Sequence, residues 1–445
     1  MQEIDKKIDE LKDEMIESIQ SLVRIKSVED SPVEGMPFGE GVDQALRHTL
    51  EIAENMGFRV KYGNGYYGYA EIGEGEEMIG ILGHVDVVPE GDLKRWCYPP
   101  YGGEIHEGRI FGRGAVDDKG PVIAALYAMK AVQELSYPIR KRVRLIVGVN
   151  EETRWECIKK YKELEETPSC GFTPDSDYPL IFAEKGLLQF QLVCNKARRV
   201  FVSGGNAYNS VPDHCTYNFQ NNPRVIKVLE ELHFDYERDG ENVTVLGKGA
   251  HSAKAFLGKN AIARLCIALK QAEIETEAID FIAEMVGEDC YAQKIVGNCE
   301  DEPSGKLTFN VAKIDLNDEQ QVIGVDIRFP VTKRKEEIIK MIQAAAEKYD
   351  LVYQEIDYLP PLYVPNEHKL VQQLRKVFED ETGLDSTPIA AGGATYARAF
   401  ENFVAFGPTF PGGEKLAHQA DEYIEIDTLV KSLKMYTKAI AELAK

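Results

Sequence analysis

The fold is decided by residues 78–88, MIGILGHVDVV, an apolar run interrupted only by two glycines, His84 and Asp86. Two further runs lie on either side of it, at 58–63 (FRVKYG) and 143–149 (VRLIVGV), and each is typical of a strand. Between the second and third runs, residues 121–135 (PVIAALYAMKAVQEL) are typical of a helix. Strands that alternate with helices in this way predict an α/β sheet with helices on both faces.

The rest of the chain predicts a second unit inserted into the first. Residues 4–23 place apolar side chains at helical spacing among charges, which indicates an amphipathic helix. From about Leu187 the pattern changes to separate strands with a few helices, which is typical of an α+β unit. The strands are expected at 187–195, 242–249, 306–314 and 321–330, and the helices near 260–273 and 335–349. Three prolines at 357–368 (DYLPPLYVPNEH) mark a break, so we expect three segments, 1–186, 187–362 and 363–445.

The charge balance excludes several classes of function. Asp and Glu number 74 against 52 Lys and Arg, which gives a formal net charge of −22. A surface of this sign opposes binding to nucleic acid and to anionic lipid. No run approaches 18 apolar residues, which excludes a membrane-spanning helix. We therefore expect neither a nucleic acid nor a membrane as a partner.

The eight cysteines indicate a reducing environment. They are scattered, and no two are spaced as C-x-x-C, so neither a zinc ribbon nor a thioredoxin-type redox pair is present. The first fifteen residues, MQEIDKKIDELKDEM, are acidic and lack the apolar segment of a secretory signal. We expect reduced thiols and a cytoplasmic location. The sequence also lacks a G-x-S-x-G nucleophile elbow, which argues against a serine hydrolase.

His84 and Asp86 stand two residues apart at the end of the first apolar run. Side chains at positions i and i+2 of an extended chain point to the same side, and ligands bind at the carboxyl ends of strands in α/β sheets. His84 could therefore bind a metal while Asp86 orients its imidazole. A strand-end histidine bonded to a neighbouring turn would give the same sequence.

Asp117 and Asp118 form an acidic pair within GRGAVDDKGP. Two adjacent acids flanked by glycines also suit a plain surface turn. The segment lacks the third glycine of G-x-G-x-x-G, and the chain has no G-x-x-x-x-G-K-[ST], so a nucleotide site is disfavoured.

Glu151 and Glu152 directly follow the strand predicted at 143–149. Asparagine followed by acids suits the start of an ordinary helix, but one glutamate could equally bind a metal while its neighbour activates water. Asp175 after a proline and His418 in a polar loop are unremarkable when taken singly.

Taken together, His84, His418 and one carboxylate from each of the positions 117–118, 151–152 and 175 suit a site for two metal ions with oxygen and nitrogen ligands. Such sites hold the ions roughly 3.5–4 Å apart and need a carboxylate that binds both. Hydrolysis also needs a further carboxylate close by as a general base.

The motifs resemble those of the di-zinc exopeptidases, a family that includes glutamate carboxypeptidase, aminoacylase, succinyl-diaminopimelate desuccinylase and the carnosinase-like dipeptidases. Six segments occur in the family's order over nearly the whole chain: HVDVVPEGD, GRGAVDDKGP, NEE, PDSDYPLIFAEKG, GGATYAR and AHQADEY. The resemblance implies an α/β fold with a mixed-sheet catalytic domain, formed by 1–186 and 363–445, and an inserted α+β lid domain at 187–362.

The resemblance also implies a role for each residue of the metal site. His84 and Asp175 would bind one ion, Glu152 and His418 the other, and Asp117 both. The two divalent ions are expected to be zinc, with manganese or cobalt as alternatives. Asp86 would orient His84, and Glu151 would take a proton from a bridging water and pass it to the leaving amine. The Asp117–Asp118 peptide is typically cis in this family.

The predicted lid is large, which resembles the bacterial dipeptidases of the carnosine-hydrolysing type and implies a monomer that closes its own site. GKGAHSAK places His251 as an oxyanion-stabilising residue, DIRFP places Arg328 as the ligand of the substrate carboxylate, and AYNSVPD places Asn209 nearby. A guanidinium pairs with a carboxylate through two parallel hydrogen bonds, and backbone N–H groups around Gly393 could add to this. Arg328 in a simple ion pair and His251 as a helix cap are the alternatives.

One motif departs from the family. The segment around His418 reads HQADE, where many relatives carry Asn before the Glu, so the hydrogen bonds around the histidine are expected to differ. The resemblance predicts a cytoplasmic metallo-dipeptidase that cleaves small unblocked dipeptides. A deacylase or desuccinylase acting on N-acyl amino acids, and a non-catalytic metal-binding protein on the same scaffold, are the alternatives.

Overall fold

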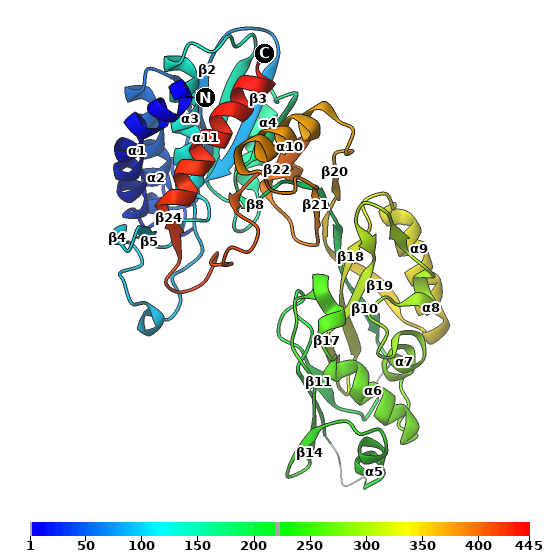
Figure 1. The fold of residues 1–445 in the computed structure, drawn as a ribbon. Helices are drawn as coiled ribbons and strands as arrows, with labels where there is room; N and C mark the ends of the chain where they lie inside the picture. Colours follow the sequence, from blue (N-terminus) through cyan, green and yellow to red (C-terminus); the bar gives the residue numbers. More distant parts are fainter. Residues whose placement is uncertain (1, 197, 219–222) are drawn as a thin grey trace. The chain divides into compact units, whose positions relative to one another are not determined.

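The computed structural model describes residues 2–196, 198–218 and 223–445, and its internal contacts divide the chain into two units (Figure 1). Unit 1 comprises Met1–Phe182, Val364–Ile389 and Ala394–Lys445, and unit 2 comprises Ala183–Tyr363 and Ala390–Gly393. These divisions lie close to the predicted boundaries at 186/187 and 362/363. The short return of the chain to unit 2 at 390–393 was not predicted.

Unit 1 is built around a mixed sheet that contains strands in the order β1-β2-β6-β3-β7-β22-β9. Their bounds are Arg59–Tyr62 (β1), Tyr67–Ile72 (β2), Met78–His84 (β3), Arg142–Gly148 (β6), Cys170–Thr173 (β7), Ile181–Glu184 (β9) and Phe403–Ala405 (β22). Strand β3 pairs in parallel with β6 and β7, and β22 pairs in parallel with β7. The other pairs are antiparallel. The predicted mixed α/β sheet is confirmed.

Helices cover this sheet, and their apolar residues form most of the core of unit 1. They are α1 (Gln2–Val23), α2 (Glu40–Asn55), α3 (Lys119–Glu134), α4 (Glu156–Leu164), α10 (Lys369–Thr382) and α11 (Ile426–Leu443). Helices α1, α3 and α11 pack against one another, and α3 also lies against β3 (Figure 1). Helix α2 packs on β1 and β2. Every residue of β3 is buried, which explains why its sequence is a continuous apolar run.

Two small sheets extend unit 1 beside the carboxyl ends of these strands. One has the order β24-β5-β4, with bounds Tyr423–Glu425, Arg109–Phe111 and Glu104–His106. The other pairs β8 (Ser176–Asp177) in parallel with β23 (Pro408–Thr409). Both connect segments more than 200 residues apart in the sequence, and the first brings the loop before α11 next to the loop before α3.

Unit 2 is an eight-stranded antiparallel sheet with helices packed on it. The strand order is β13-β14-β12-β11-β17-β18-β10-β19, with bounds Tyr236–Asp239, Asn242–Leu246, His214–Asn218, Val202–Gly204, Thr308–Leu316, Gln321–Phe329, Gly186–Cys194 and Val352–Leu359. Helices α5 (Pro223–Glu231), α6 (Ala261–Gln271), α7 (Glu277–Phe281) and α9 (Lys335–Ala346) share one apolar core with the sheet. The predicted α+β unit is confirmed.

Among the described residues, no helix is both long and apolar enough to cross a membrane. All eight cysteines are free thiols.

Candidate functional site

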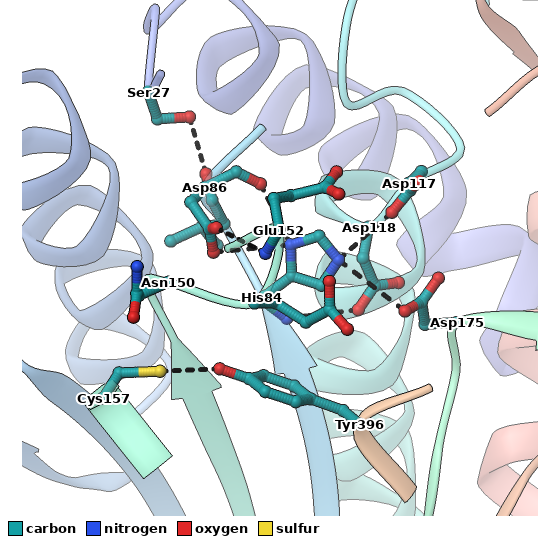
Figure 2. Close-up of polar contacts among 12 residues, drawn as sticks. Ser27, His84, Asp86, Asp117, Asp118, Asn150, Glu152, Cys157, Asp175 and Tyr396 are labelled. Carbon is teal, nitrogen blue, oxygen red and sulfur yellow. Dashed lines mark hydrogen bonds and ion pairs between the residues drawn. The ribbon is translucent and has the colours of Figure 1, made fainter. Parts of the chain in front are cut away.

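Three neighbouring parallel strands of unit 1 place polar side chains at one edge of the sheet (Figure 2). His84 is the last residue of β3, and Glu152 lies in the turn after β6. Asp175 lies two residues after the end of β7. Because β3 lies between β6 and β7, His84 is central and the two carboxylates flank it. Carboxyl ends of parallel strands are where α/β folds bind ligands.

Asp117 reaches the same edge from the loop between β5 and α3. The Asp117–Asp118 peptide is cis, as predicted. The Asp118 side chain is fully buried, and its Oδ2 accepts a hydrogen bond from the backbone N–H of His84 at 3.2 Å. Asp118 therefore ties the start of α3 to the end of β3, and Asp117 is left to face the cluster.

The two oxygens of Asp117 face two different histidines. Asp117 Oδ1 lies 3.1 Å from His84 Nε2, and Asp117 Oδ2 lies 3.1 Å from His418 Nε2. The same Nε2 of His418 is also 3.1 Å from Glu152. The same Nε2 of His84 is also 3.7 Å from Asp175 Oδ2. The structure thus brings together all five residues predicted as metal ligands.

Asp86 supports the cluster through its backbone and through its carboxylate. The backbone oxygen of Asp86 accepts from His84 Nδ1 at 2.9 Å, while the Asp86 carboxylate Oδ1 is farther away, at 3.5 Å. When the His84 ring is neutral, with its proton on Nδ1, its lone pair lies on Nε2, the atom that faces Asp117. The other carboxylate oxygen of Asp86 accepts from the backbone N–H of Glu152 at 3.1 Å, which fixes the turn after β6.

The electrostatics of the cluster favour a bound cation. Burial raises the pKa of Asp175, and the neighbouring Asp117 carboxylate raises that pKa further. Burial likewise raises the pKa of Glu152. Carboxylates crowded into a buried site repel one another, and divalent cations are the charges that relieve such repulsion in proteins.

The pKa values of the two histidines also indicate a site for positive charge. Burial alone would lower the pKa of His84, but the carboxylates around it outweigh this and raise the pKa well above its ordinary value. Hydrogen bonds to Asp117 and Glu152 raise the pKa of His418 to about 10. Without a bound cation, both imidazoles are therefore doubly protonated, and their positive charge offsets the negative charge of the carboxylates.

The donor set and its spacing fit divalent metal ions. His84, Asp117 and Glu152 each offer a ligand atom, and the three atoms lie within 4.8 Å of one another. Zinc binds nitrogen and carboxylate oxygen at about 2.0–2.2 Å, so two ligands of one tetrahedral ion lie about 3.4 Å apart. The observed ligand separations of 3.1 and 3.7 Å agree with this spacing.

Glu151 adjoins the cluster and is the candidate base. The turn that carries it is held by Trp155, whose Nε1 donates to the Glu151 carbonyl oxygen at 2.7 Å. Burial raises the pKa of the Glu151 carboxyl well above its usual range, and nearby Asp175 adds to the rise. A carboxylate with a raised pKa is a better proton acceptor near neutral pH.

The predicted substrate-binding residues lie together in unit 2. The backbone oxygen of Asn209 accepts from Ser252 N, the neighbour of His251, at 2.9 Å. Arg328 Nη1 donates to the backbone oxygen of Gly392, which precedes Gly393, at 3.2 Å. Asn209, His251, Arg328 and Gly393 thus form one cluster, although they are scattered over almost 190 residues of sequence.

The tautomer of His251 leaves a donor available. Its Nδ1 accepts from the backbone N–H of Ala253 at 3.2 Å, which caps the following 3-10 helix Ser252–Leu257. The neutral ring therefore carries its proton on Nε2. Burial lowers the pKa of His251, and the charge of Arg328 lowers it further. Both predicted roles, helix cap and hydrogen-bond donor, are compatible with this geometry.

Arg328 is buried and paired. Asp326, two residues earlier on β18, accepts from Arg328 Nε at 2.9 Å and from Nη2 at 3.2 Å. Gln189 Nε2 holds the same Asp326 carboxylate from the neighbouring strand at 2.9 Å. The Nε–Nη2 edge of the guanidinium is therefore occupied by Asp326, and the ion pair named as the alternative role of Arg328 is present.

Several residues that support the metal cluster were not predicted from sequence. Ser27 Oγ donates to the backbone oxygen of Val85 at 2.6 Å, and Glu29 accepts from Asn150 at 2.8 Å. Buried Lys119 donates to the backbone oxygens of Leu22, in the last turn of α1, and of Ile25, just after this helix. Ser27 and Glu29 stand in a segment with no ligand-like pattern, and the motifs that contain Asn150 and Lys119 do not reveal their distant partners, so only the fold shows these contacts.

The aspartate in HQADE has a defined partner. Asp421 Oδ1 accepts from the backbone N–H of Cys97 at 2.6 Å. An asparagine side-chain oxygen at this position would accept the same hydrogen bond. Asp421, which departs from the asparagine of the family motif, therefore keeps the side-chain oxygen that accepts this hydrogen bond.

A family model described as Peptidase family M20/M25/M40 matches residues 80–442. The chain is 38% identical to "Putative dipeptidase YtjP" of Bacillus subtilis (strain 168), with 98% of each chain covered. It is 32% identical to "Putative dipeptidase SH1171" of Staphylococcus haemolyticus (strain JCSC1435), again with 98% of each chain covered.

Solved structures share the fold at low sequence identity. Human carnosine dipeptidase 1 aligns with a TM-score of 0.58 and 15% identity, covering 100% of this chain and 99% of that one. The di-peptidase Dug1p of Saccharomyces cerevisiae aligns with a TM-score of 0.60 and 14% identity, covering 99% and 98%. Aminoacylhistidine dipeptidase of Vibrio alginolyticus aligns with a TM-score of 0.60 and 12% identity, covering 96% of each chain.

Proposed function

The chain belongs to peptidase family M20/M25/M40, and from this premise we propose that it hydrolyses small unblocked dipeptides with two divalent metal ions. The single observation that carries the metal-dependent part is the Asp117 carboxylate, whose two oxygens each lie 3.1 Å from a different histidine. The choice of dipeptides is supported by the dipeptidase names of relatives that are 31–38% identical over the full chain.

The distances among the five residues support the proposed ligands. His84 and Asp175 would hold one ion, Glu152 and His418 the other, and Asp117 both. Bound there, two zinc ions would polarise the scissile carbonyl and make water acidic near neutral pH. Zinc suits this mixture of imidazole and carboxylate donors, with manganese or cobalt as alternatives.

Within this scheme, Glu151 moves the proton. Its carboxylate accepts a proton from the attacking water and returns it to the nitrogen of the leaving amine. The backbone of Glu151 is anchored by Trp155, which limits the positions that the carboxylate can reach.

We assign substrate binding to the cluster in unit 2. His251 would donate its Nε2–H to the oxygen of the scissile carbonyl as negative charge develops. Arg328 would bind the substrate carboxylate with its Nη1–Nη2 edge, and Asn209 and the backbone near Gly393 would add hydrogen bonds. We further propose that the chain acts as a monomer in the cytoplasm, in keeping with its eight free thiols.

Two glutamine variants test the assignment of Glu151 and Glu152. Glu151→Gln should lower kcat by about 10²–10⁴-fold and keep its bound metal, whereas Glu152→Gln should lose metal affinity. Bound metal would be measured by elemental analysis of dialysed protein. A Glu151→Gln variant with nearly normal kcat would show that the base is wrong.

A substrate panel tests the reaction class. Unblocked dipeptides, tripeptides, N-acetyl amino acids and N-succinyl amino acids would be compared by kcat/KM after metal is restored to chelated protein. We expect the dipeptides to be preferred. Preference for the acylated amino acids would establish a deacylase, and no metal-dependent hydrolysis of any compound would leave a binding protein.

A further inference from the structure

We propose that Glu422 and Arg113 are positioning residues that fix the Asp117 carboxylate relative to the His418 imidazole. The catalytic consequence rests on the proposed function, but the effect on metal binding does not depend on which substrate is cleaved.

The pairing of two short strands brings these residues together. Strands β5 and β24 are antiparallel, with Phe111 opposite Tyr423. The next position on each strand continues the ladder, since Gly112 N donates to the backbone oxygen of Glu422 at 2.9 Å. Arg113 therefore leaves β5 at the point where Glu422 enters β24, even though the two residues are separated by 309 positions.

The Glu422 carboxylate organises the turn that carries Asp117. Its Oε1 accepts from the backbone N–H groups of Val116, at 3.1 Å, and Asp117, at 3.3 Å. Its Oε2 accepts from Arg113 Nη1 at 2.5 Å. The Glu422 side chain is completely inaccessible to solvent, so water does not compete for these hydrogen bonds.

Arg113 extends the connection to the other loops of the metal cluster. Its Nη1 also donates to the backbone oxygen of Gln419, the residue after His418, at 3.2 Å. Its Nη2 donates to the backbone oxygen of Pro89 at 3.4 Å, in the loop that follows His84 and Asp86. One guanidinium therefore contacts the loops after β3 and before β24, and one carboxylate joins it to the turn of Asp117.

Burying the Arg113–Glu422 ion pair costs desolvation free energy, so a purely stabilising role does not explain its presence. Removing two charges from water is unfavourable, and a buried ion pair often contributes little net stability compared with apolar side chains. The same pair gives geometric definition, because a planar guanidinium that donates to three acceptors and a carboxylate that accepts from three donors have few alternative arrangements. Residues that orient metal ligands typically change metal affinity about 10–100-fold when replaced.

The chain offers a matched control for the test. Glu71 and Arg144 form another buried ion pair in unit 1, with Arg144 Nη2 2.6 Å from Glu71 Oε2 and side-chain exposures of 6% and 8%. This pair joins β2 and β6 and has no hydrogen bond to a proposed metal ligand among the described contacts. Glu71→Gln should therefore lower the stability of unit 1, as Glu422→Gln does, without the effect on metal binding.

The experiment is a titration of the chelated full-length chain with Co²⁺, followed by visible absorption and by calorimetry. In Glu422→Gln we expect one of the two Co²⁺ equivalents to bind about 10–100-fold more weakly, with a changed absorption spectrum. The kcat should fall while KM stays within about twofold. Glu71→Gln should match the wild-type spectrum, affinity and kcat.

Equal Co²⁺ affinities and spectra for wild type and Glu422→Gln would overturn the proposal. Arg113→Lys, which keeps the charge but loses the fork of donors, decides the matter if Glu422→Gln does not fold, because it should show the same weakening. If both variants fail to fold while Glu71→Gln folds, the pair is structural and the proposal is wrong. If wild type binds Co²⁺ as expected but hydrolyses no dipeptide, only the proposed function fails.

Discussion

Loading the chelated protein with zinc at pH 7 should release about two protons per chain. His84 lies among carboxylates that raise its pKa well above the ordinary value, and hydrogen bonds to Asp117 and Glu152 raise the pKa of His418 to about 10. Both imidazoles are therefore protonated in the metal-free chain at pH 7. Because a metal-binding imidazole must be neutral, each has to lose its proton when the ion binds.

The magnitude follows from linkage between protons and metal. One proton released per binding event changes the binding free energy by about 1.36 kcal/mol per pH unit. Two protons correspond to about 2.7 kcal/mol, or about a 100-fold gain in affinity for each unit of rising pH. The gain should become smaller as the pH rises through 10, where the metal-free chain no longer holds the proton on His418.

Calorimetry in buffers of different ionisation enthalpy measures the number of protons directly. The apparent binding enthalpy is plotted against the ionisation enthalpy of the buffer, and the slope gives the number of protons released. Wild type should give a slope of about two, and His418→Gln should give a slope lower by about one. A slope near zero for wild type at pH 7 would refute the reasoning, because it would mean that the imidazoles of the metal-free chain are already neutral.

Three further predictions concern single residues. Arg328→Lys should raise KM for dipeptides about tenfold or more with a smaller change in kcat, since lysine loses the planar fork; an unchanged KM would argue against the carboxylate assignment. Gly148→Ala should lower the free energy of unfolding by about 1–3 kcal/mol, as a Cβ there would overlap Tyr396, which packs edge-on against a metal-cluster histidine; an unchanged denaturation midpoint would contradict this. A hydrogen bond from Arg198 lowers the pKa of Glu277 to about 2. Ionised Glu277 therefore stabilises the folded chain above pH 4.5, and this contribution is lost as pH falls toward 2. Glu277→Gln should then make unfolding less pH-dependent over that range, and an unaltered acid-denaturation profile would disprove the pairing.

The elements that could be predicted from sequence are those with long, uniform apolar patterns. Strand β3 and helix α3 are buried along nearly their whole length, so the apolar runs at 78–88 and 121–135 mark them clearly. Strands β7 and β22 have only four and three residues. Runs that short carry too little periodicity to be distinguished from loops.

The metal cluster could be predicted because its members stand in motifs that resemble a known family. The supporting residues could not, because their partners are distant in sequence. Glu422 and Arg113 meet only through the pairing of β5 with β24. The pairing of Asp326 with Arg328 has a short-range signal, because the two residues alternate on one strand and their side chains therefore share a face of the sheet.

The most direct test of the central claim is the metal content of the purified chain, measured by elemental analysis together with dipeptide hydrolysis before and after chelation. The account predicts two divalent ions per chain, loss of hydrolysis when they are removed, and recovery when zinc, manganese or cobalt is restored. Asp117→Asn should reduce the content below two ions. Dipeptide hydrolysis at full rate by a metal-free chain would contradict the account.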